Sequence, residues 1–442
     1  MLRKVSLLLL SGCGCLMADV NDDDYQCKEE YNNDEWLNLA VTNHLRKAGI
    51  DADLCFCGNL DFTSTFISQK ENESKSGSVF SAQGNVDLRY LQRVDGYGFG
   101  AELLAKTRSG VIKHGRAIMN SAFLFLEADK IGVVRFGYIN TAADALGLGG
   151  DKVLAGYGGA GSAELEAFYN ASTGSIIGTG FTFDDDKAAK ISWISPVISG
   201  FSGGLSYTFS SRNSNLFKKE HDPEEEGRNP KEDFAHETAY SKNVVTGGIA
   251  YEYGSPDGWH AKIALTGWLG SGQSNCVGVE VENVRAYNIG AILKYKNSEF
   301  AVGYTDNGKS LLAKKYAIRD AGAFNPAREY RINDDDVGLG AGANAGKIYT
   351  LGFAQTFGKF VASVGYFHSV VKFSGSAKST ANIITVASEY KFNKTFCVYA
   401  EYDSINTYTC DAALSYAKAC GGESPTKDNR ANVFMVGMKV NF

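Results

Sequence analysis

Several stretches of this sequence contain residue types that could bind a phosphate, hold a metal ion or catalyse a reaction. The glycine-rich turn GLGGDK (147–152) is of the kind that cradles phosphate, but no Gly-Lys-Ser/Thr follows it and no helix is signalled. The CFC stretch (55–57) offers two thiols, but no second ligand pair lies at metal-site spacing. Asp triplets at 22–24, 184–186 and 334–336 are better interpreted as solvated turns. The six histidines are scattered, and no G-x-S-x-G motif occurs. We therefore expect no cofactor, no metal site and no enzymatic activity.

Charged side chains, by contrast, recur at alternating positions in consecutive segments that could form strands. Apolar residues fall on one face of each segment and charged residues on the other, because successive side chains of a strand point to opposite faces. Such charges could orient polar solutes in an aqueous space. The charged face holds Asp87, Arg89 and Arg93 (84–94), Glu102, Lys106 and Arg108 (98–108), Arg116 with Asn120 (116–128), and Asp184, Asp186 and Lys190 if Trp193 points the other way (178–194).

The elements that would position these charges are β-strands. The chain ends on VFMVGMKVNF (433–442), a strictly alternating segment that suits either the last strand of a soluble sandwich or the closing strand of an outer-membrane barrel. A count of 50 glycines against 6 prolines, with 23 tyrosines and 26 phenylalanines, favours a large antiparallel β-structure. No run of about 18 apolar residues is present.

Sixteen strands are predicted from the alternation, and the connections between them decide between the two folds. Short turns alternate with long polar loops such as 211–242, 308–346 and 409–431, and aromatic pairs flank the short turns. This arrangement is typical of an all-β, transmembrane, antiparallel up-and-down barrel with an aromatic girdle on its periplasmic side. The predicted strands are 60–70, 84–94, 98–108, 116–128, 133–141, 178–194, 201–210, 243–253, 259–269, 284–295, 300–306, 347–357, 360–372, 381–391, 396–407 and 432–442.

The N-terminal part of the chain differs from the rest. Residues 1–18 have a short basic region and a brief apolar core, which predicts an export signal peptide. A lipoprotein signal that ends at Cys13 is the alternative. Residues 19–58 form an acidic and then amphipathic segment, interpreted as a periplasmic segment with one short helix, before a barrel over 59–442. In an oxidising compartment Cys410 and Cys420, which bracket one loop, are the preferred disulfide pair. The pI of about 5.7 gives no indication of nucleic-acid binding.

Three stretches resemble the general bacterial porins, the trimeric diffusion channels of Gram-negative outer membranes. They are SAFLFLEADKIGVVRFGYINTAADAL (121–146), AAKISWISPVISGFSGGLSYTFSS (188–211) and the terminal strand. Tyr138 departs from the family, which often has Arg at that place, and residues 19–58 have no counterpart in it. The resemblance implies a homotrimer in outer-membrane lipid and recognition of the terminal Phe442 by the barrel-assembly machinery.

The resemblance also implies where solutes would be selected. In these porins the third external loop folds inward and its acidic residues face basic residues of the wall, so that the field across the gap sorts solutes. Residues 142–177 occupy the matching place. The implied constriction combines the loop residues Asp144, Asp151, Glu164 and Glu166 with the wall residues Arg89, Arg93, Lys106, Arg108 and Arg116.

The leading hypothesis is therefore an outer-membrane porin for passive diffusion of small hydrophilic solutes and ions. Two alternatives stay open at this point. One is a surface structural protein or adhesin with a plugged barrel, in which residues 19–58 or the long loops supply the plug. The other is a substrate-selective uptake barrel for anions or sugars.

Overall fold

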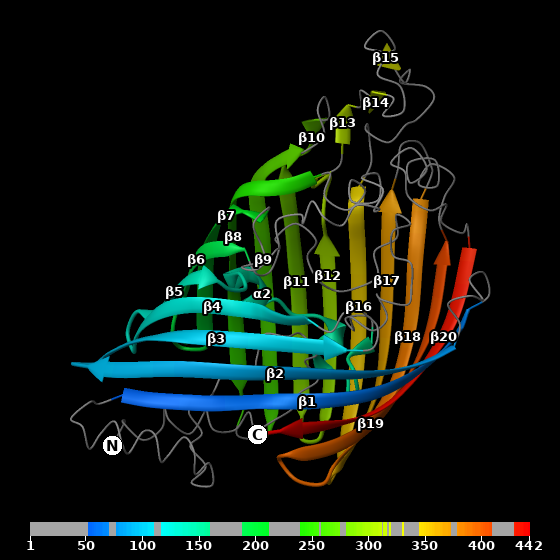
Figure 1. Ribbon diagram of the computed structural model, residues 1–442, viewed down its shortest axis with the longest axis horizontal. Coiled ribbons are helices and arrows are strands. Elements are labelled where there is room, and N and C mark those ends of the chain that lie inside the picture. Colours follow the sequence, from blue (N-terminus) through cyan, green and yellow to red (C-terminus); the bar gives the residue numbers. More distant parts are fainter. Residues whose placement is uncertain are drawn as a thin grey trace.

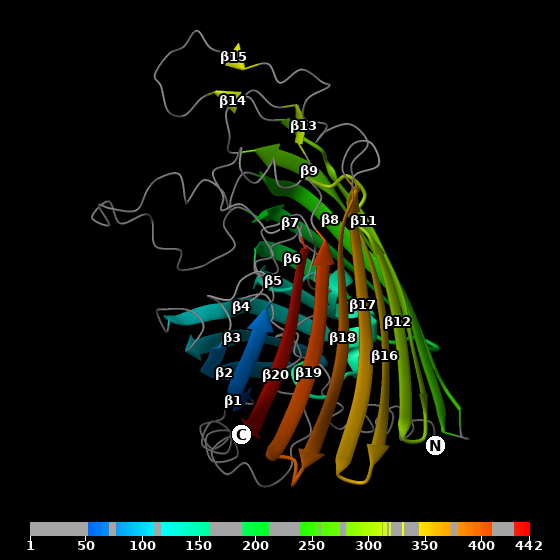
Figure 2. The ribbon, with the colours of Figure 1, turned by 90° about the vertical axis from the view of Figure 1, so that its right-hand side faces the viewer.

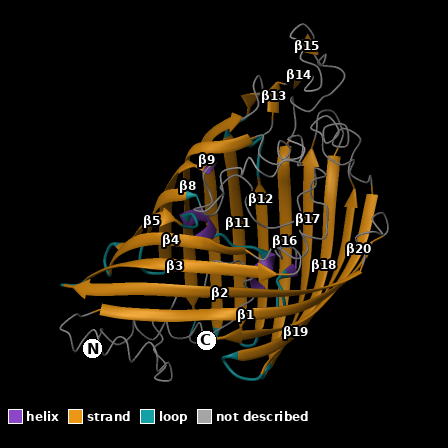
Figure 3. Cartoon of the chain, viewed as in Figure 1, coloured by secondary structure: helices purple, strands orange, loops and turns teal. Residues whose placement is uncertain are grey.

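The computed structural model describes residues 52–69, 77–109, 116–159, 188–211, 239–255, 258–274, 280–311, 313–315, 318–319, 329–330, 344–372, 378–408 and 428–442. Sixteen strands form one closed barrel in which each strand pairs antiparallel with its neighbours in sequence (Figures 1 and 3). They are β1 (Ala52–Gln69), β2 (Gly77–Val94), β3 (Tyr97–Ser109), β4 (Arg116–Ala128), β5 (Gly132–Tyr138), β6 (Ala189–Ile194), β7 (Phe201–Ser210), β8 (Ala239–Gly254), β9 (Trp259–Ser274), β11 (Val284–Tyr295), β12 (Ser298–Asp306), β16 (Asn344–Phe357), β17 (Phe360–Lys372), β18 (Lys378–Lys391), β19 (Phe396–Tyr408) and β20 (Asp428–Asn441).

Within the described residues, four shorter strands and two short helices lie outside the ring of paired barrel strands. β10 (Glu280–Val281) pairs with β13 (Ala313–Lys315), and β14 (Ile318–Arg319) pairs with β15 (Glu329–Tyr330). The helices are α2 (Ala142–Leu146) and the 3-10 helix η2 (Gly150–Val153). None of the helices in the described residues has the length and apolar character needed to cross a bilayer.

The barrel closes where its first strand meets its last. β1 pairs with β20 over eleven register positions, from Asn59 opposite Asn441 to Gln69 opposite Ala431. The backbone N–H groups of Gly58 and Phe442 each donate to the other's carbonyl oxygen, at 2.8 and 2.9 Å. The Phe442 ring lies 6.1 Å from the Phe56 ring. The terminal residue is thus part of the closing seam.

The predicted number of strands and their antiparallel order are confirmed, but the N-terminal boundary needs a correction. β1 begins at Ala52, so residues 52–58 belong to the barrel and not to the preceding segment. Asp53, Cys55 and Cys57 alternate with Leu54 and Phe56, and each finds a register partner on a longer β2. The signal peptide, the helix expected before residue 50, and most of the predicted sixth strand lie outside the described residues.

The up-and-down order places the short turns at one end of the barrel, as the alternation of connection lengths predicts, and Figure 2 shows those after β16 and β18 at its lower edge. The turn between β2 and β3 places Asp95 and Gly96 at φ 50° and 83°, and Lys296 in the turn between β11 and β12 has φ 52°. Left-handed backbone of this kind matches the right-handed twist of a two-residue hairpin, and Asp-Gly is a preferred sequence for it.

The two faces of the wall differ in the way the alternation predicts. Large apolar side chains are exposed on the outer face, for example Leu124, Phe136, Ile249 and Phe434. Polar side chains such as Asp87, Thr246, Asn288 and Glu401 are buried on the inner face. Exposed rings also flank the short turns, and the Trp259 and Tyr295 rings stack there at 4.2 Å.

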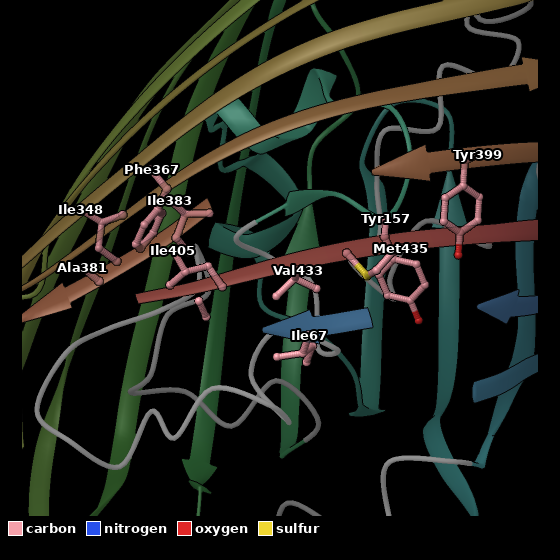
Figure 4. Packing of buried hydrophobic residues seen from close by; sticks show 11 residues of the cluster. Ile67, Tyr157, Ile348, Phe367, Ala381, Ile383, Tyr399, Ile405, Val433 and Met435 are labelled. Atoms are coloured by element: carbon pink, nitrogen blue, oxygen red, sulfur yellow. The ribbon is translucent and has the colours of Figure 1, made fainter. Parts of the chain in front are cut away.

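One part of the inner face is apolar, which the expectation of a polar lumen missed. Eleven buried residues on β1 and β16–β20 and at Tyr157 form a single cluster (Figure 4). They alternate along each strand with exposed outer-face residues, so they point inward. Because an apolar side chain gains free energy where other atoms exclude water, the burial of these residues stabilises this side of the wall. The cluster contains Ile67, Tyr157, Ile348, Phe367, Ala381, Ile383, Tyr399, Ile405, Ala431, Val433 and Met435.

Candidate functional site: a loop segment and a charged wall inside the barrel

Residues 142–159, here called the loop segment, leave β5 and lie against the inner face of the barrel. The loop segment begins with α2, whose N-cap is Thr141. The Thr141 hydroxyl accepts from the Asp144 backbone N–H at 3.1 Å, and the Asp144 carboxylate accepts from the Thr141 backbone N–H at 3.1 Å. This reciprocal capping box fixes the direction in which the chain enters the barrel.

α2 packs on β7, β8 and β9 through its smallest residues. Ala142 and Ala143 are fully buried, and the Ala142 backbone N–H donates to the Ser206 hydroxyl at 2.7 Å. A Cβ added at Gly204 would lie 2.7 Å from the Cβ of Ala142, so only glycine allows this approach. Ala143 also joins the buried Trp268 in an apolar cluster.

Beyond α2 the loop segment lies in a groove made by glycines of four neighbouring strands, here called the glycine groove: Gly290 (β11), Gly303 (β12), Gly352 (β16) and Gly365 (β17). Gly290 is the register partner of Gly303, and Gly352 is the register partner of Gly365. An added Cβ would come within 1.9 Å of a loop-segment backbone oxygen at Gly352, and within 2.2 Å of another at Gly290. The missing side chains therefore let the loop-segment backbone lie directly on the wall.

The end of the loop segment is held by one carboxylate on β19. Glu401 is buried and accepts hydrogen bonds from three consecutive backbone N–H groups, those of Tyr157 (2.6 Å), Gly158 (3.1 Å) and Gly159 (3.1 Å). The φ angles of Gly158 and Gly159 are +96° and +62°, a left-handed conformation that turns successive N–H groups toward one anion. We call these three hydrogen bonds the loop clasp.

Further polar contacts surround the loop clasp. Lys439 on β20 donates to the Gly156 carbonyl at 2.6 Å and lies over the Tyr399 ring at 5.0 Å. The Tyr399 hydroxyl donates to Asp61 at 2.8 Å. Asp403, on the same face of β19 as Glu401, accepts from the Thr385 hydroxyl at 2.6 Å. Burial of these polar groups is tolerated because each is engaged in hydrogen bonds.

The remaining charged groups of the site gather on β1–β5, away from the loop clasp. Arg89 donates to Glu127 at 3.3 Å and lies within 4.0 Å of Glu102. Arg93 pairs with Asp53 at 3.0 Å and with Glu127 at 3.7 Å. We call this group, together with Arg135 on β5, the charged wall.

Two of the arginines also stack on aromatic rings of β4. The Arg89 guanidinium lies 4.8 Å from the centroid of Phe125, and that of Arg135 lies 5.6 Å from Phe123. Such cation–π contacts hold the guanidinium groups flat against the wall, since the ring face attracts a cation. The arginines thus have fixed positions in the barrel.

The structure brings together only some of the predicted site residues. Arg89 and Arg93 lie in the charged wall, and Lys106 is half-buried on β3 opposite Asn85. The carboxylate of Asp144 serves the helix cap, and Asp151 is half-buried in η2. Outside these, Arg108 and Arg116 are register partners on β3 and β4. Glu164, Glu166, Cys410 and Cys420 lie outside the described residues, as do Asp184 and Asp186. Lys190 is fully buried on β6, and Trp193 beside it is exposed on the outer face, as predicted.

Several functional residues were not identified from the sequence. Arg135 alternates with the outward Val134 and Phe136, so the rule that selected Arg89 would also have selected it. Glu401 and Asp403 alternate with Tyr402 in the same way. Their roles depend on where the loop segment lies, and no local pattern contains that information.

Comparison with known proteins adds three findings. The family model described as Gram-negative porin matches residues 49–409. An uncharacterised protein of Rickettsia bellii is 24% identical over 369 residues, which cover 73% of this chain and 76% of the relative. An uncharacterised protein of Rickettsia typhi is 23% identical over 441 residues, which cover 91% and 87%.

Solved structures of other barrels share the fold. Salmonella typhi OmpF, in a complex with daunomycin, superposes with a TM-score of 0.55 over 89% of this chain and 98% of its own, at 14% identity. The anion-selective porin of Comamonas acidovorans gives a TM-score of 0.54 over 88% and 100%, also at 14% identity. Vibrio cholerae OmpT, an outer membrane protein solved in a trimer form, gives 0.50 over 88% and 99% at 13% identity.

Proposed function

The chain belongs to the Gram-negative porin family, and on that premise we propose that it forms a water-filled channel in the outer membrane. Small hydrophilic solutes and ions would diffuse through it passively. The observation that supports this most directly is the inversion of the wall: apolar side chains cover the outer face and hydrogen-bonded polar side chains the inner face. A barrel of sixteen strands is also of the size that leaves an aqueous channel.

The path of the solutes follows from the position of the loop segment. The loop segment contacts β6–β9, β11, β12, β16 and β17, the loop clasp lies on β19, and the Tyr157 hydroxyl donates to Gln83 of β2 at 3.4 Å. The charged wall lies on β1–β5, so the end of the loop segment reaches one of the strands that carry it. We place the constriction between the two, where charges fixed on the wall would orient polar solutes and penalise apolar ones.

The charge count of this wall bears on selectivity. Arg89, Arg93 and Arg135 stand against Asp53, Glu102 and Glu127, three basic groups against three acidic groups. Charges in a narrow aqueous gap are screened over roughly 8 Å at physiological salt, so such a balanced set gives only weak preference for one ion. A general pore with slight selectivity is therefore expected.

We further propose that the channel assembles as a homotrimer. The support is family membership, together with the trimer form in which Vibrio cholerae OmpT was solved. The exposed apolar outer face would be shared between lipid and neighbouring copies. Cross-linking in detergent followed by mass measurement tests this proposal, and a monomer under all conditions would contradict it.

One observation favours a second function. The apolar cluster on the inner face of β16–β20 is buried, so protein atoms cover this part of the inner wall. A barrel that is filled throughout would not conduct and would instead present its long loops as a surface structural protein or adhesin.

Planar-bilayer recording of the purified protein separates these functions. Stepwise conductance increases are expected of the porin, and silence would support the surface protein. Block by anions or sugars alone would indicate a selective uptake barrel.

Selectivity tests the charged wall itself. Replacing Arg89 and Arg93 by Gln should shift the reversal potential in a KCl gradient toward cation preference, because Glu127 and Asp53 lose their partners. The matched control is Lys130→Gln with Lys394→Gln, which removes two exposed cations from short turns outside the lumen. An unchanged reversal potential in the arginine variant would remove the charged wall from the solute path.

A further inference from the structure

Two lysines face each other on the outer surface of the barrel, at the end opposite the short turns. Lys372 is the last residue of β17 and Lys378 the first of β18, and they are direct register partners. Both side chains are exposed. Lys372 belongs to the outward set of its strand, because it continues the alternation that exposes Val364 and Tyr366.

This arrangement is unfavourable unless an anion is present. Side chains directly opposite each other on an antiparallel pair have Cβ atoms roughly 5 Å apart, and like charges at this distance repel. β17 contains no acidic residue, and the one acid of β18, Glu389, is buried on the inner face. The protein itself therefore provides no carboxylate between the two lysines on these strands.

The next strand shows how a similar position is neutralised. Lys347 on the outer face of β16 is two register positions from Lys372, since its partner on β17 is Val370. Its ammonium pairs with Asp306 of β12 at 3.1 Å. Lys372 and Lys378 thus differ from Lys347 in lacking an acidic neighbour on the outer face of their own strand pair.

The height of the two lysines on the barrel corresponds to a lipid headgroup region. Phe360, beside a short turn, and Lys372 are twelve residues apart on β17. At roughly 3.3 Å per residue and a strand tilt of about 45°, this separates them by about 28 Å along the barrel axis. The apolar band of such barrels is about 25 Å tall, so the lysines lie just beyond it.

Below the lysines, beyond the outward pair Val370 and Thr380, polar side chains occupy the outer face. The Tyr366 hydroxyl donates to Asn382 at 3.1 Å, and His368 lies 2.7 Å from the same amide oxygen. Amphipathic and polar groups of this kind favour the boundary between hydrocarbon and water. They mark the level at which the apolar surface ends.

From the opposed charges and their height, we propose that Lys372 and Lys378 form a binding site for the phosphate group of an anionic membrane lipid, one whose headgroup carries no cation to neutralise that phosphate. Two ammonium groups on adjacent strands can both donate to the oxygens of one phosphate, which removes their mutual repulsion. The site lies outside the solute path, and it rests on the proposed insertion of the barrel in a membrane.

The test compares the full-length protein in two kinds of nanodisc, phosphatidylcholine alone and phosphatidylcholine with phosphatidic acid. The wild type should unfold at a higher temperature when phosphatidic acid is present. The Lys372→Gln, Lys378→Gln variant should lose this rise. In phosphatidylcholine alone the variant should be at least as stable as the wild type, because the repulsion is gone. Lys130→Gln with Lys394→Gln, in turns at the other end, should keep the wild-type rise.

Two outcomes would overturn the site. One is an equal rise in the wild type and in the Lys372, Lys378 variant. The other is the same rise when inorganic phosphate is added to phosphatidylcholine nanodiscs, which would assign the lysines to a soluble anion and not to a lipid. Single-channel conductance of the variant should equal that of the wild type, so failure of the lipid site and failure of the channel are distinguishable.

Discussion

Removing the carboxylate of the loop clasp should release the loop segment from the wall. In Glu401→Ala the backbone N–H groups of Tyr157, Gly158 and Gly159 lose their acceptor. A typical intramolecular hydrogen bond contributes about 0.5–1.5 kcal/mol to stability. Since water can enter the space vacated here, about 1 kcal/mol for each of the three bonds is a conservative figure, or about 3 kcal/mol in total. That corresponds to roughly a hundredfold increase in the displaced population.

Single-channel recording measures this release directly. The open-channel current of Glu401→Ala should show added noise and brief closures, because a mobile loop segment moves into the solute path. The matched control is Glu389→Gln on β18, a buried inner-face carboxylate that pairs with Lys391 at 3.5 Å. Current traces of Glu401→Ala that match the wild type would refute the role of the clasp. Equal noise in Glu389→Gln would show that any lost inner carboxylate has the same effect.

Three further outcomes are expected. Gly352→Ala would place a Cβ 1.9 Å from a backbone oxygen of the loop segment, where 3.4 Å is an ordinary contact distance. The loop segment must therefore move by about 1.5 Å, and the single-channel conductance should change. The control is Gly267→Ala, whose Cβ would be 3.5 Å from its nearest atom and should leave the conductance unchanged. Deleting Phe442 removes both seam hydrogen bonds that it forms with the first strand, and should lower the yield of heat-modifiable folded barrel on gels, whereas Phe442→Tyr should preserve it. Cys410 and Cys420 should be joined in the exported protein, and peptide mapping that finds both thiols alkylated without prior reduction would contradict the pairing.

The barrel could be predicted from the sequence because apolar and polar residues alternate along each strand, and because short turns alternate with long loops between the strands. Both signals are local, and the short turns confine each strand between fixed ends. The predicted start of the barrel at residue 59 was wrong. Asp53, Cys55 and Cys57 lie on one face of β1 and alternate with Leu54 and Phe56, but the mixed composition of this stretch hid that alternation.

The candidate site was predictable only on the wall. The alternation of side chains along the strands identified Arg89 and Arg93. It could not show that Arg89 stacks on Phe125, or that Glu127 forms ion pairs with both arginines. The loop clasp joins residues 157–159 to Glu401, about 240 positions away, and this pairing depends on the closed ring and not on any motif. The inner apolar cluster was missed for the same reason.

The closing seam also constrains the order in which the protein can form. Neighbouring strands joined by short turns make contacts between residues close in sequence, which form quickly. The seam instead joins Asn59 to Asn441, a separation of 441 − 59 = 382 residues. Contacts of such high order form late, so β1 and β20 remain open sheet edges while the hairpins between them assemble. Open edges pair readily with other chains. The interval before the seam closes is therefore the period in which this chain most needs a partner that shields its edges.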